Sequence, residues 1–265
     1  MEPAITIFQS FSKPLPHVDS DNVEYHTMTS EAASNQNQDP IRVLTKKDPA
    51  ILLKSAQEAL QLATSIPGCL QQLMPQLGTS HYIRTEKDVL RISALQLVYP
   101  VNAVLSGILP AGATLRCQSE VVSQKGKARM DLRWHYKKAG KEATVAVLEY
   151  KNLNTLQLRD WKPIITDAAG ATAVIDKAAH NDNLSLLQRN ALGLSRQVKK
   201  YSKECKDVVL FDWYSMYIFD FEGTNEDRHH PFPTRITYSS DSSKFRRLLL
   251  GMIYRRLKEE GLVKA

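Results

Sequence analysis

The sequence predicts a mixed α/β (α+β) fold, and a β-hairpin near its middle is the clearest element. Polar and apolar residues alternate along residues 127–136, which is typical of a half-buried strand. The run Ala143–Leu148 is almost wholly apolar and rich in small and β-branched residues, as in an interior strand. A polar turn around Gly140 joins the two runs, and stretches with helical spacing lie on both sides. The alternation places one apolar set on a single face: Met130, Leu132, Trp134 and Tyr136.

Residues 1–45 are predicted to form a disordered N-terminal arm. The segment Asp19–Asp39 has few large apolar groups, so its packing cannot offset the entropy lost on ordering. Asp48 followed by Pro49 then predicts a helix start. Residues 46–84 are expected to be a helical extension beside the main domain.

One helix and one strand are predicted between this extension and the hairpin. Thr85–Asp88 has the form of a capping box and predicts a helix start. Thr114–Val122 alternates polar and apolar residues and predicts the first strand of a sheet. A turn at Ser123–Lys127 would lead from it into the hairpin.

Downstream of the hairpin, the sequence predicts a small-residue helix at Ala168–Ala179 and a long amphipathic helix from Leu184. The later elements are strands at Val208–Phe211, Met216–Phe221 and Arg235–Tyr238, and a final helix capped by Ser242 or Ser243. That helix is expected to bury its leucines and expose its basic residues, Arg246, Arg247, Arg255, Arg256 and Lys258. Residues 46–265 would thus be one domain, with a C-terminal loop and helix at 222–265.

Three charged residues at one end of the hairpin predict a catalytic metal site. Glu149 and Lys151 lie two positions apart at the end of the second strand, so they point to the same face. An antiparallel pairing brings Asp131, on the first strand, to that end of the sheet. Two carboxylates there predict a site for a hard cation such as Mg²⁺, with the carbonyl of Tyr150 as a further ligand. Lys151 would orient the water that attacks a phosphate ester.

These residues resemble the motif of the PD-(D/E)XK nuclease superfamily, in which an acid precedes an acid-x-lysine triplet. Here Asp131 precedes Glu149-Tyr150-Lys151. The resemblance covers residues 85–221 and implies a restriction-endonuclease-like αβββαβ core, nuclease activity and Mg²⁺ or Mn²⁺ as cofactor. A second triplet, Glu204-Cys205-Lys206, has the same pattern. Only the first triplet ends an apolar strand and follows a strand that carries an acid.

A further motif lies on the long helix after the hairpin. Gln197 and Tyr201 form a Q-x-x-x-Y pattern, which resembles the extra motif of the RecB-like branch of the same superfamily. Positions i and i+4 are neighbours on one helix face, so both side chains could reach the metal site or a nucleotide. Alternatively, Tyr201 belongs to the apolar stripe of this helix and is a core residue. The Asp212-Trp213 pair gives a further resemblance to fungal proteins with such a domain.

Two additional acids are candidates near the predicted site. The superfamily often places an acid on the first helix of the core, which makes Glu86 a candidate; otherwise Glu86 is a solvated acid favoured by the helix dipole. Glu120, on the strand before the hairpin, is the second candidate. The turn between the strands would place Glu120 near Met130, on the face away from Asp131.

The basic character of the chain predicts a nucleic-acid partner. The net charge is +7 and the pI is about 9.2, which fits a polyanionic ligand. The long helix carries a basic stripe that could follow a phosphate backbone, formed by Arg196, Lys199, Lys200 and Lys203. Arg255 and Arg256 on the final helix form a second candidate surface. Either surface could instead be merely solvated.

Composition excludes several classes of protein. With 265 residues, 43% hydrophobic and 24% charged, the chain has the composition of a soluble globular protein. The cysteines Cys69, Cys117 and Cys205 lack C-x-x-C spacing, which argues against disulfides and zinc. His229-His230 is expected to be an exposed pair. Neither a signal peptide nor a membrane span is predicted, so the expected location is intracellular, in the cytoplasm or nucleus.

Two interpretations of function stay open. The first is a metal-dependent nuclease that acts on DNA, with Asp131 and Glu149 as metal ligands. The second is an inactive module that keeps the nuclease-like fold and binds nucleic acid or a protein partner, in a regulatory or effector-like role. The complete set of two acids and a lysine favours the enzyme. Cutting both strands at once would favour a homodimer.

Overall fold

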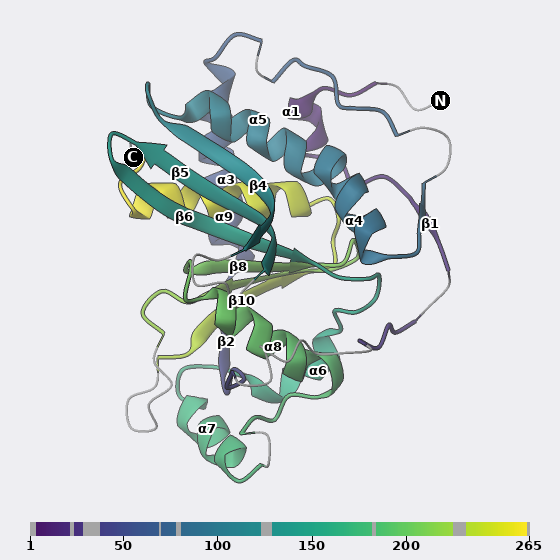
Figure 1. The fold of residues 1–265 in the computed structure, drawn as a ribbon, viewed down its shortest axis with the longest axis vertical. Coiled ribbons are helices and arrows are strands. Elements are labelled where there is room, and N and C mark those ends of the chain that lie inside the picture. Colours follow the sequence, from purple (N-terminus) through teal and green to yellow (C-terminus); the bar gives the residue numbers. More distant parts are fainter. Residues whose placement is uncertain are drawn as a thin grey trace.

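The computed structural model describes residues 4–21, 24–28, 38–68, 70–77, 81–122, 129–181, 184–224 and 232–263. Its centre is an eight-stranded mixed sheet that lies between two layers of helices (Figure 1). The strands follow the order β4 (Thr114–Val122), β5 (Arg129–Lys138), β6 (Lys141–Tyr150), β8 (Asp207–Phe211), β9 (Met216–Asp220), β10 (Thr234–Ser239), β2 (Leu44–Lys46) and β7 (Ile165–Thr166). A separate pair joins β1 (Asp19–Ser20) and β3 (Tyr82–Ile83). The α+β class predicted from the sequence is confirmed.

The helices divide between the two faces of the sheet (Figure 1). One face is covered by α1 (Ile7–Ser10), α3 (Pro49–Thr64), α4 (Glu86–Ser93), the π-helical η1 (Ala94–Val98), α5 (Tyr99–Ile108) and α9 (Phe245–Glu259). The other face carries α6 (Leu158–Trp161), the 3-10 turn η2 (Lys162–Ile164), α7 (Ala171–Ala179) and α8 (Arg189–Tyr201). The helix predicted from Leu184 thus begins five residues later, at Arg189.

Local capping explains where two of these helices begin. The Asp48 carboxylate accepts a hydrogen bond from the Ala50 N–H at 2.8 Å, one residue after the proline that starts α3. Thr85 and Asp88 form the predicted capping box at the start of α4. The box fixes where α4 begins, and Glu86 is the first residue of this helix.

Pairing in the sheet brings the ends of β5, β6 and β8 together. β4, β5 and β6 are antiparallel neighbours, and Leu132 pairs with Leu148. β6 and β8 are parallel, with Tyr150 opposite Phe211. The Lys151 N–H continues this pairing by donating to the Phe211 carbonyl at 2.9 Å. The residues that follow Leu148 therefore lie at the carboxyl end of two parallel strands, a usual place for a binding site.

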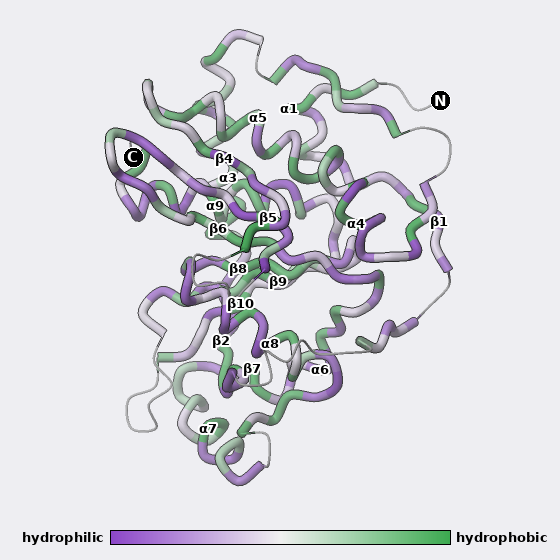
Figure 2. Tube along the Cα trace, in the orientation of Figure 1, coloured by the Kyte–Doolittle hydropathy of each residue, from purple (hydrophilic) through white to green (hydrophobic). Residues whose placement is uncertain are grey.

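Two large apolar clusters and a small one at Val43, Ala171 and Ile175 fill the space between the sheet and its helices, and the middle strands are mostly hydrophobic (Figure 2). Leu132, Trp134 and Tyr136 pack in the cluster beneath α3, α5 and α9. Met130 packs in the other cluster, with Val198 of α8. The prediction that Met130 shares a face with Leu132 is therefore wrong; the regular pairing of β5 with β6 runs from Leu132 to Lys138 and does not include Met130.

The N-terminal region is packed in its described part, so the predicted disordered arm is wrong there. Ile7, Phe11, Leu15 and Val18 are buried in the cluster beneath α9. Ile41 and Leu44 are buried in the other cluster, and β2 joins the sheet between β10 and β7. The remainder of the predicted arm, together with Cys69, the turn at Ser123–Lys127 and His229-His230, lies outside the described residues.

The basic residues of α9 are also placed differently from the prediction. Arg246, Arg255 and Arg256 are 2%, 9% and 2% exposed. Arg255 donates to Asp207 and Asp220 at 2.8 and 2.9 Å, and Arg256 donates to Asp207 at 2.7 Å. Because Arg255 and Arg256 neutralise acids at the far end of β8 and β9, they do not form the exposed nucleic-acid surface that was predicted.

One helical run, Glu86–Ile108, is long and apolar enough by length and composition to cross a membrane. It is the one such run in the part of the chain that the structure describes, and more than half of its apolar stretch is buried inside the protein. Its side chains Val89, Ile92 and Val101 belong to the core beneath α9. Its hydropathy is therefore that of a core helix.

Candidate functional site

Asp131 and Glu149 lie on adjacent strands at the same end of the sheet. The Tyr150 backbone N–H donates to Asp131 Oδ2 at 2.8 Å, so the backbone of β6 holds the carboxylate of β5 in place. The Tyr150 ring points the other way, into the core, where it contacts the Phe211 ring edge-on. The alternation of side chains along β6 thus places Glu149 and Lys151 on the α8 side of the sheet.

Glu149 is the centre of a hydrogen-bond network and is 5% exposed. Lys151 Nζ lies 2.9 Å from Glu149 Oε1. Gln197 Nε2 donates to the same oxygen, and Tyr201 Oη donates to Glu149 Oε2 at 3.0 Å. A buried carboxylate requires such partners, and here every partner is one of the residues singled out from the sequence.

Gln197 and Tyr201 reach Glu149 together because they lie one turn apart on α8. Gln197 Nε2 also donates to Tyr201 Oη at 2.8 Å. Tyr201 Oη is 2.7 Å from the Arg129 carbonyl at the start of β5. Burial, and then the charge of Glu149, raise the pKa of Tyr201, so its hydroxyl stays a donor. Tyr201 is therefore both a core residue and a contact to Glu149.

Lys151 is a buried cation that lies between two acids. It is 6% exposed, and its Nζ is 3.7 Å from Glu86 Oε2 as well as close to Glu149. Burial acts to lower the pKa of Lys151, but Glu149 and Glu86 outweigh it and raise the pKa above the usual value. Lys151 is thus held as an ammonium that can donate hydrogen bonds. Glu86 faces this group from the first turn of α4.

Burial and the neighbouring acids raise the pKa of Asp131. Burial is the largest cause and the charge of Glu149 the second, and together they raise the pKa of Asp131 to about 7. Burial likewise raises the pKa of Glu86. Three carboxylates gathered around one ammonium leave an excess of negative charge. A bound cation would remove the repulsion between them.

The donor set fits a hard divalent cation. No group of three or more His, Cys, Asp or Glu side chains within the described residues is arranged to hold a metal ion. The ligands predicted from the sequence, the carboxylates of Asp131 and Glu149 with the carbonyl of Tyr150, are fewer than such a group and would need water to complete the coordination. Mg²⁺ commonly binds through one or two carboxylates and keeps several waters.

Glu120 is not brought to this site. It lies opposite the region of Asp131, but its backbone has a positive φ of 51° and its carboxylate pairs with Arg129 at 2.7 Å in an exposed position. The left-handed backbone turns the side chain away from the two acids. Of the two extra acids, Glu86 is thus next to Lys151 and Glu120 is not.

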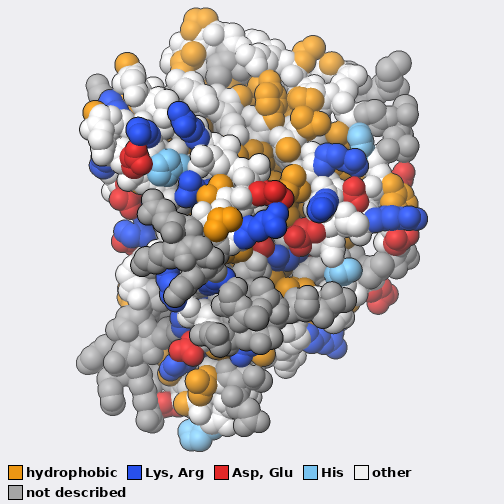
Figure 3. All heavy atoms as spheres, in the orientation of Figure 1, with side chains coloured by type: hydrophobic (Ala, Val, Ile, Leu, Met, Phe, Trp, Pro, Cys, Tyr) orange, Lys and Arg blue, Asp and Glu red, His pale blue; other side chains and the backbone are white. Residues whose placement is uncertain are grey.

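The basic stripe on α8 lies next to the site, partly covered by the N-terminal segment. Lys203 Nζ donates to Gln38 Oε1 at 2.6 Å, and Lys199 Nζ donates to the Pro40 carbonyl at 3.3 Å. Burial lowers the pKa of Lys200, which Glu149 partly restores, so this lysine is within the field of the site. Figure 3 shows acidic and basic side chains side by side near the middle of this face.

Asp212 has a structural role near the site that was not predicted from the sequence. It is fully buried at the end of β8, and its Oδ2 accepts a hydrogen bond from the Leu156 N–H at 2.8 Å. Burial raises the pKa of Asp212 to about 7. This carboxylate ties the chain that follows Lys151 to the end of β8. The sequence could not reveal this structural role of Asp212, because an acid that follows an apolar strand is a common pattern.

Comparisons of the chain with protein-family models, with curated proteins and with solved structures return no match.

Proposed function

We propose that this protein is a metal-dependent nuclease that hydrolyses phosphodiester bonds of nucleic acid, with DNA as its substrate. The observation that carries the proposal is the position of Asp131, Glu149 and Lys151 at one end of the sheet. Neither carboxylate pairs with a cation from elsewhere in the described chain: Glu149 pairs with Lys151, and Asp131 accepts from the backbone. Their excess negative charge suits a divalent cation.

The order of elements around these residues supports the same proposal. From α4 to β8 the chain forms helices, three antiparallel strands, the elements α6, η2, β7 and α7, the helix α8, and a strand parallel to β6. If α6 to α7 are an insertion, the remaining elements follow the order of the αβββαβ core that the PD-(D/E)XK resemblance implies. In that arrangement the two acids and the lysine come from the second and third strands, as Asp131, Glu149 and Lys151 do.

Each residue then has a distinct role. Asp131, Glu149 and the Tyr150 carbonyl would hold Mg²⁺ or Mn²⁺, which when bound stabilises charge on the phosphate and lowers the pKa of coordinated water. Lys151 would donate to the attacking water and orient it. Gln197 and Tyr201 position the Glu149 carboxylate through their hydrogen bonds. Mutation of such supporting groups commonly lowers metal affinity or activity about 10- to 100-fold.

The stripe on α8 supplies the contact to the substrate backbone. Arg196, Lys199 and Lys200 lie on the helix that also carries Gln197 and Tyr201, and Lys203 follows two residues after its end, so a phosphate chain along this helix would pass the candidate ligands. Such contacts are not specific for sequence and weaken as salt increases. The expected substrate preference is therefore set by the shape of the nucleic acid rather than by its bases.

The test is cleavage of plasmid and single-stranded DNA with Mg²⁺ or Mn²⁺. We expect Asp131→Ala and Lys151→Ala to abolish cutting and to retain DNA binding. Lys206→Ala is the matched control, because Lys206 belongs to the second E-x-K triplet but pairs with Glu222 at the surface, at 2.7 Å. This variant should cut like the wild type.

Two results would reject the nuclease. Tight DNA binding without cutting under either metal would favour the inactive module. Cutting that survives Asp131→Ala would place any activity elsewhere in the molecule.

A further inference from the structure

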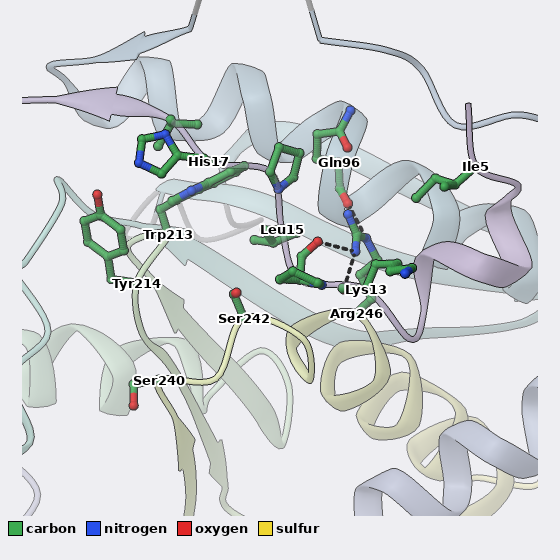
Figure 4. A pocket seen from close by; sticks show the side chains of 13 residues that line it. Ile5, Lys13, Leu15, His17, Gln96, Trp213, Tyr214, Ser240, Ser242 and Arg246 are labelled. Carbon is green, nitrogen blue, oxygen red and sulfur yellow. Dashed lines mark hydrogen bonds between the residues drawn. The ribbon is translucent and has the colours of Figure 1, made fainter. Parts of the chain in front are cut away.

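A cavity of about 730 Å³ opens on the side of the sheet that α9 covers (Figure 4). Its walls come from the segment 13–18, from Gln96 of η1, from the Trp213-Tyr214 loop after β8, and from the start of α9 with Ser242 and Arg246. The volume is within the range of about 300–1,000 Å³ that is typical of small-molecule sites. None of the candidate metal ligands lines it.

Arg246 is a buried cation on the wall of this cavity. Its Nε donates to the Gln96 carbonyl at 2.6 Å, and its Nη1 donates to the carbonyls of Ser10 and Lys13 at 2.8 and 3.0 Å. All these acceptors are neutral, and no ion pair joins Arg246 to an acid in the described part of the chain. Burial is the cause that lowers the pKa of Arg246 to about 10.

Two other arginines of α9 are also buried but, unlike Arg246, have acidic partners. Arg255 and Arg256 are similarly buried, and each donates to the carboxylate of Asp207. A buried charge without a counter-ion is costly in free energy, and an anionic ligand at Arg246 would offset that cost. Arg246 Nη2 makes no hydrogen bond to a described residue and is available for this contact.

The rest of the polar lining also suits an anion. Lys13 is exposed, and its amine makes no hydrogen bond or ion pair with a described residue. Ser240 and Ser242 are among the lining residues, the Ser242 hydroxyl points toward the other lining side chains (Figure 4), and no acid lines the cavity. Asp241 lies between the two serines in sequence, but its carboxylate is bound by Ser243 and Lys244. The cavity therefore carries two permanent positive charges and no negative charge.

The opposite side of the cavity is aromatic. Figure 4 shows Trp213 and Tyr214 on one side, with Arg246 and Lys13 on the other. Trp213 has a left-handed backbone, with φ of 76°, which is strained for a bulky residue. Asp212 holds this loop by accepting hydrogen bonds from the N–H groups of Tyr214 and Ser215 at 3.2 and 2.8 Å. The Trp213 indole is 3% exposed and packs against the Phe211 ring, so Tyr214, which is 40% exposed, is the ring of this loop that a planar ligand can reach.

We propose that this cavity binds a small aromatic phosphate ester of the mononucleotide class, with its phosphate at Arg246 and Lys13 and its ring at Tyr214. A phosphate monoester carries about −1.5 to −2 charges near neutral pH. That charge balances the two permanent cations, whereas a single carboxylate would leave one unmatched. The site is separate from the proposed metal site and does not depend on nuclease activity.

The test is calorimetry of the full chain in EDTA with four probes: adenosine 5′-monophosphate, adenosine, ribose 5-phosphate and inorganic phosphate. We expect the nucleotide to bind one to one and more tightly than any of the other three. Asp131→Asn should bind the nucleotide like the wild type, which separates this cavity from the proposed metal site.

Variants decide whether the cavity is the site of binding. Arg246→Ala removes contacts to the N-terminal segment and can unfold the protein, so Lys13→Ala is the main variant. It should weaken nucleotide binding about tenfold, the effect of losing one charge-assisted hydrogen bond. Lys54→Ala, an exposed lysine on α3 outside the cavity, is the matched control. No binding of the nucleotide, equal affinity for adenosine or inorganic phosphate, or unchanged affinity in Lys13→Ala would each overturn the proposal.

Discussion

Tyr150 and Asp131 are joined by a hydrogen bond from the Tyr150 backbone N–H to Asp131 Oδ2, 2.8 Å long. The donor is a backbone group at the end of β6, so the position of the carboxylate depends on the pairing of two strands rather than on a neighbouring charge. Asp131 Oδ1 has no hydrogen bond to a described residue. One oxygen therefore fixes the side chain, and the other is available to a ligand.

Asp131→Asn is predicted to separate these two tasks. The asparagine carbonyl can still accept from Tyr150 N–H, so the fold should persist, but the charge that would hold a metal ion is lost. We expect DNA cleavage to fall more than about a hundredfold, beyond the effect typical of a group that only supports a ligand. Initial cleavage rates and urea unfolding of the same samples measure both effects. Retained cleavage in a folded variant would contradict the assignment.

The raised pKa of Asp131 predicts how stability depends on pH and metal. Burial and Glu149 raise this pKa from 3.8 to about 7, so the folded protein holds a proton that the unfolded chain has released. The contribution to the free energy of unfolding is complete below pH 3.8 and is lost as the pH rises through 7. Mg²⁺ binds the ionised form and should raise the melting temperature at pH 8 more than at pH 5.5.

Thermal unfolding with Mg²⁺ or EDTA at both pH values checks this prediction. Asp212 titrates in the same window, since burial raises its pKa to about 7, but it is not a candidate ligand. Its effect should therefore persist in Asp131→Asn, while the stabilisation by Mg²⁺ disappears. Equal stabilisation by Mg²⁺ at both pH values would argue against Asp131 as a ligand.

The hairpin could be predicted from sequence because its signals are local. Alternation along a strand fixes which side chains share a face, so Glu149 and Lys151 are placed without knowledge of the fold. In the same way, the spacing of Gln197 and Tyr201 fixes their common face on α8. That both side chains contact Glu149 could not be predicted from periodicity, because it depends on how α8 packs against the sheet.

The features that the sequence did not reveal are set by distant partners. Arg256 is buried because Asp207 of β8 accepts its hydrogen bond, and the helical pattern of α9 contains no information on that acid. Ile7 and Phe11 belong to a short apolar run at residues 4–11 that shows no clear period, and their burial depends on the surface that α3 and α9 present. Strands as short as Ile165–Thr166 have too few residues to show a period.

Tyr201→Phe is predicted to lower activity through Glu149. The substitution removes the hydroxyl that donates to Glu149 Oε2 and lies 2.7 Å from the Arg129 carbonyl. We expect cleavage to fall about 10- to 100-fold and the free energy of unfolding to fall by about 1–3 kcal/mol. Tyr217→Phe is the matched control, since Tyr217 is buried in the same cluster and its hydroxyl has no hydrogen bond to a described residue. An equal loss of activity in both variants would show that Glu149 is not the cause.

Arg256→Ala is predicted to affect stability and not nucleic-acid binding. Arg256 donates to Asp207 at 2.7 Å and to Glu222 at 2.7 Å, and it is one of the two arginines that neutralise the fully buried Asp207. Removing one partner of a buried ion pair commonly costs about 3–5 kcal/mol, whereas the partly exposed pair of Lys258 with Glu58 should contribute at most about 1 kcal/mol. Urea unfolding of Arg256→Ala and Lys258→Ala measures this difference. The DNA affinity of the folded fraction should be unchanged in both variants, because neither side chain lies on the basic stripe of α8. If Arg256→Ala bound DNA more weakly at an equal folded fraction, α9 would be part of the binding surface.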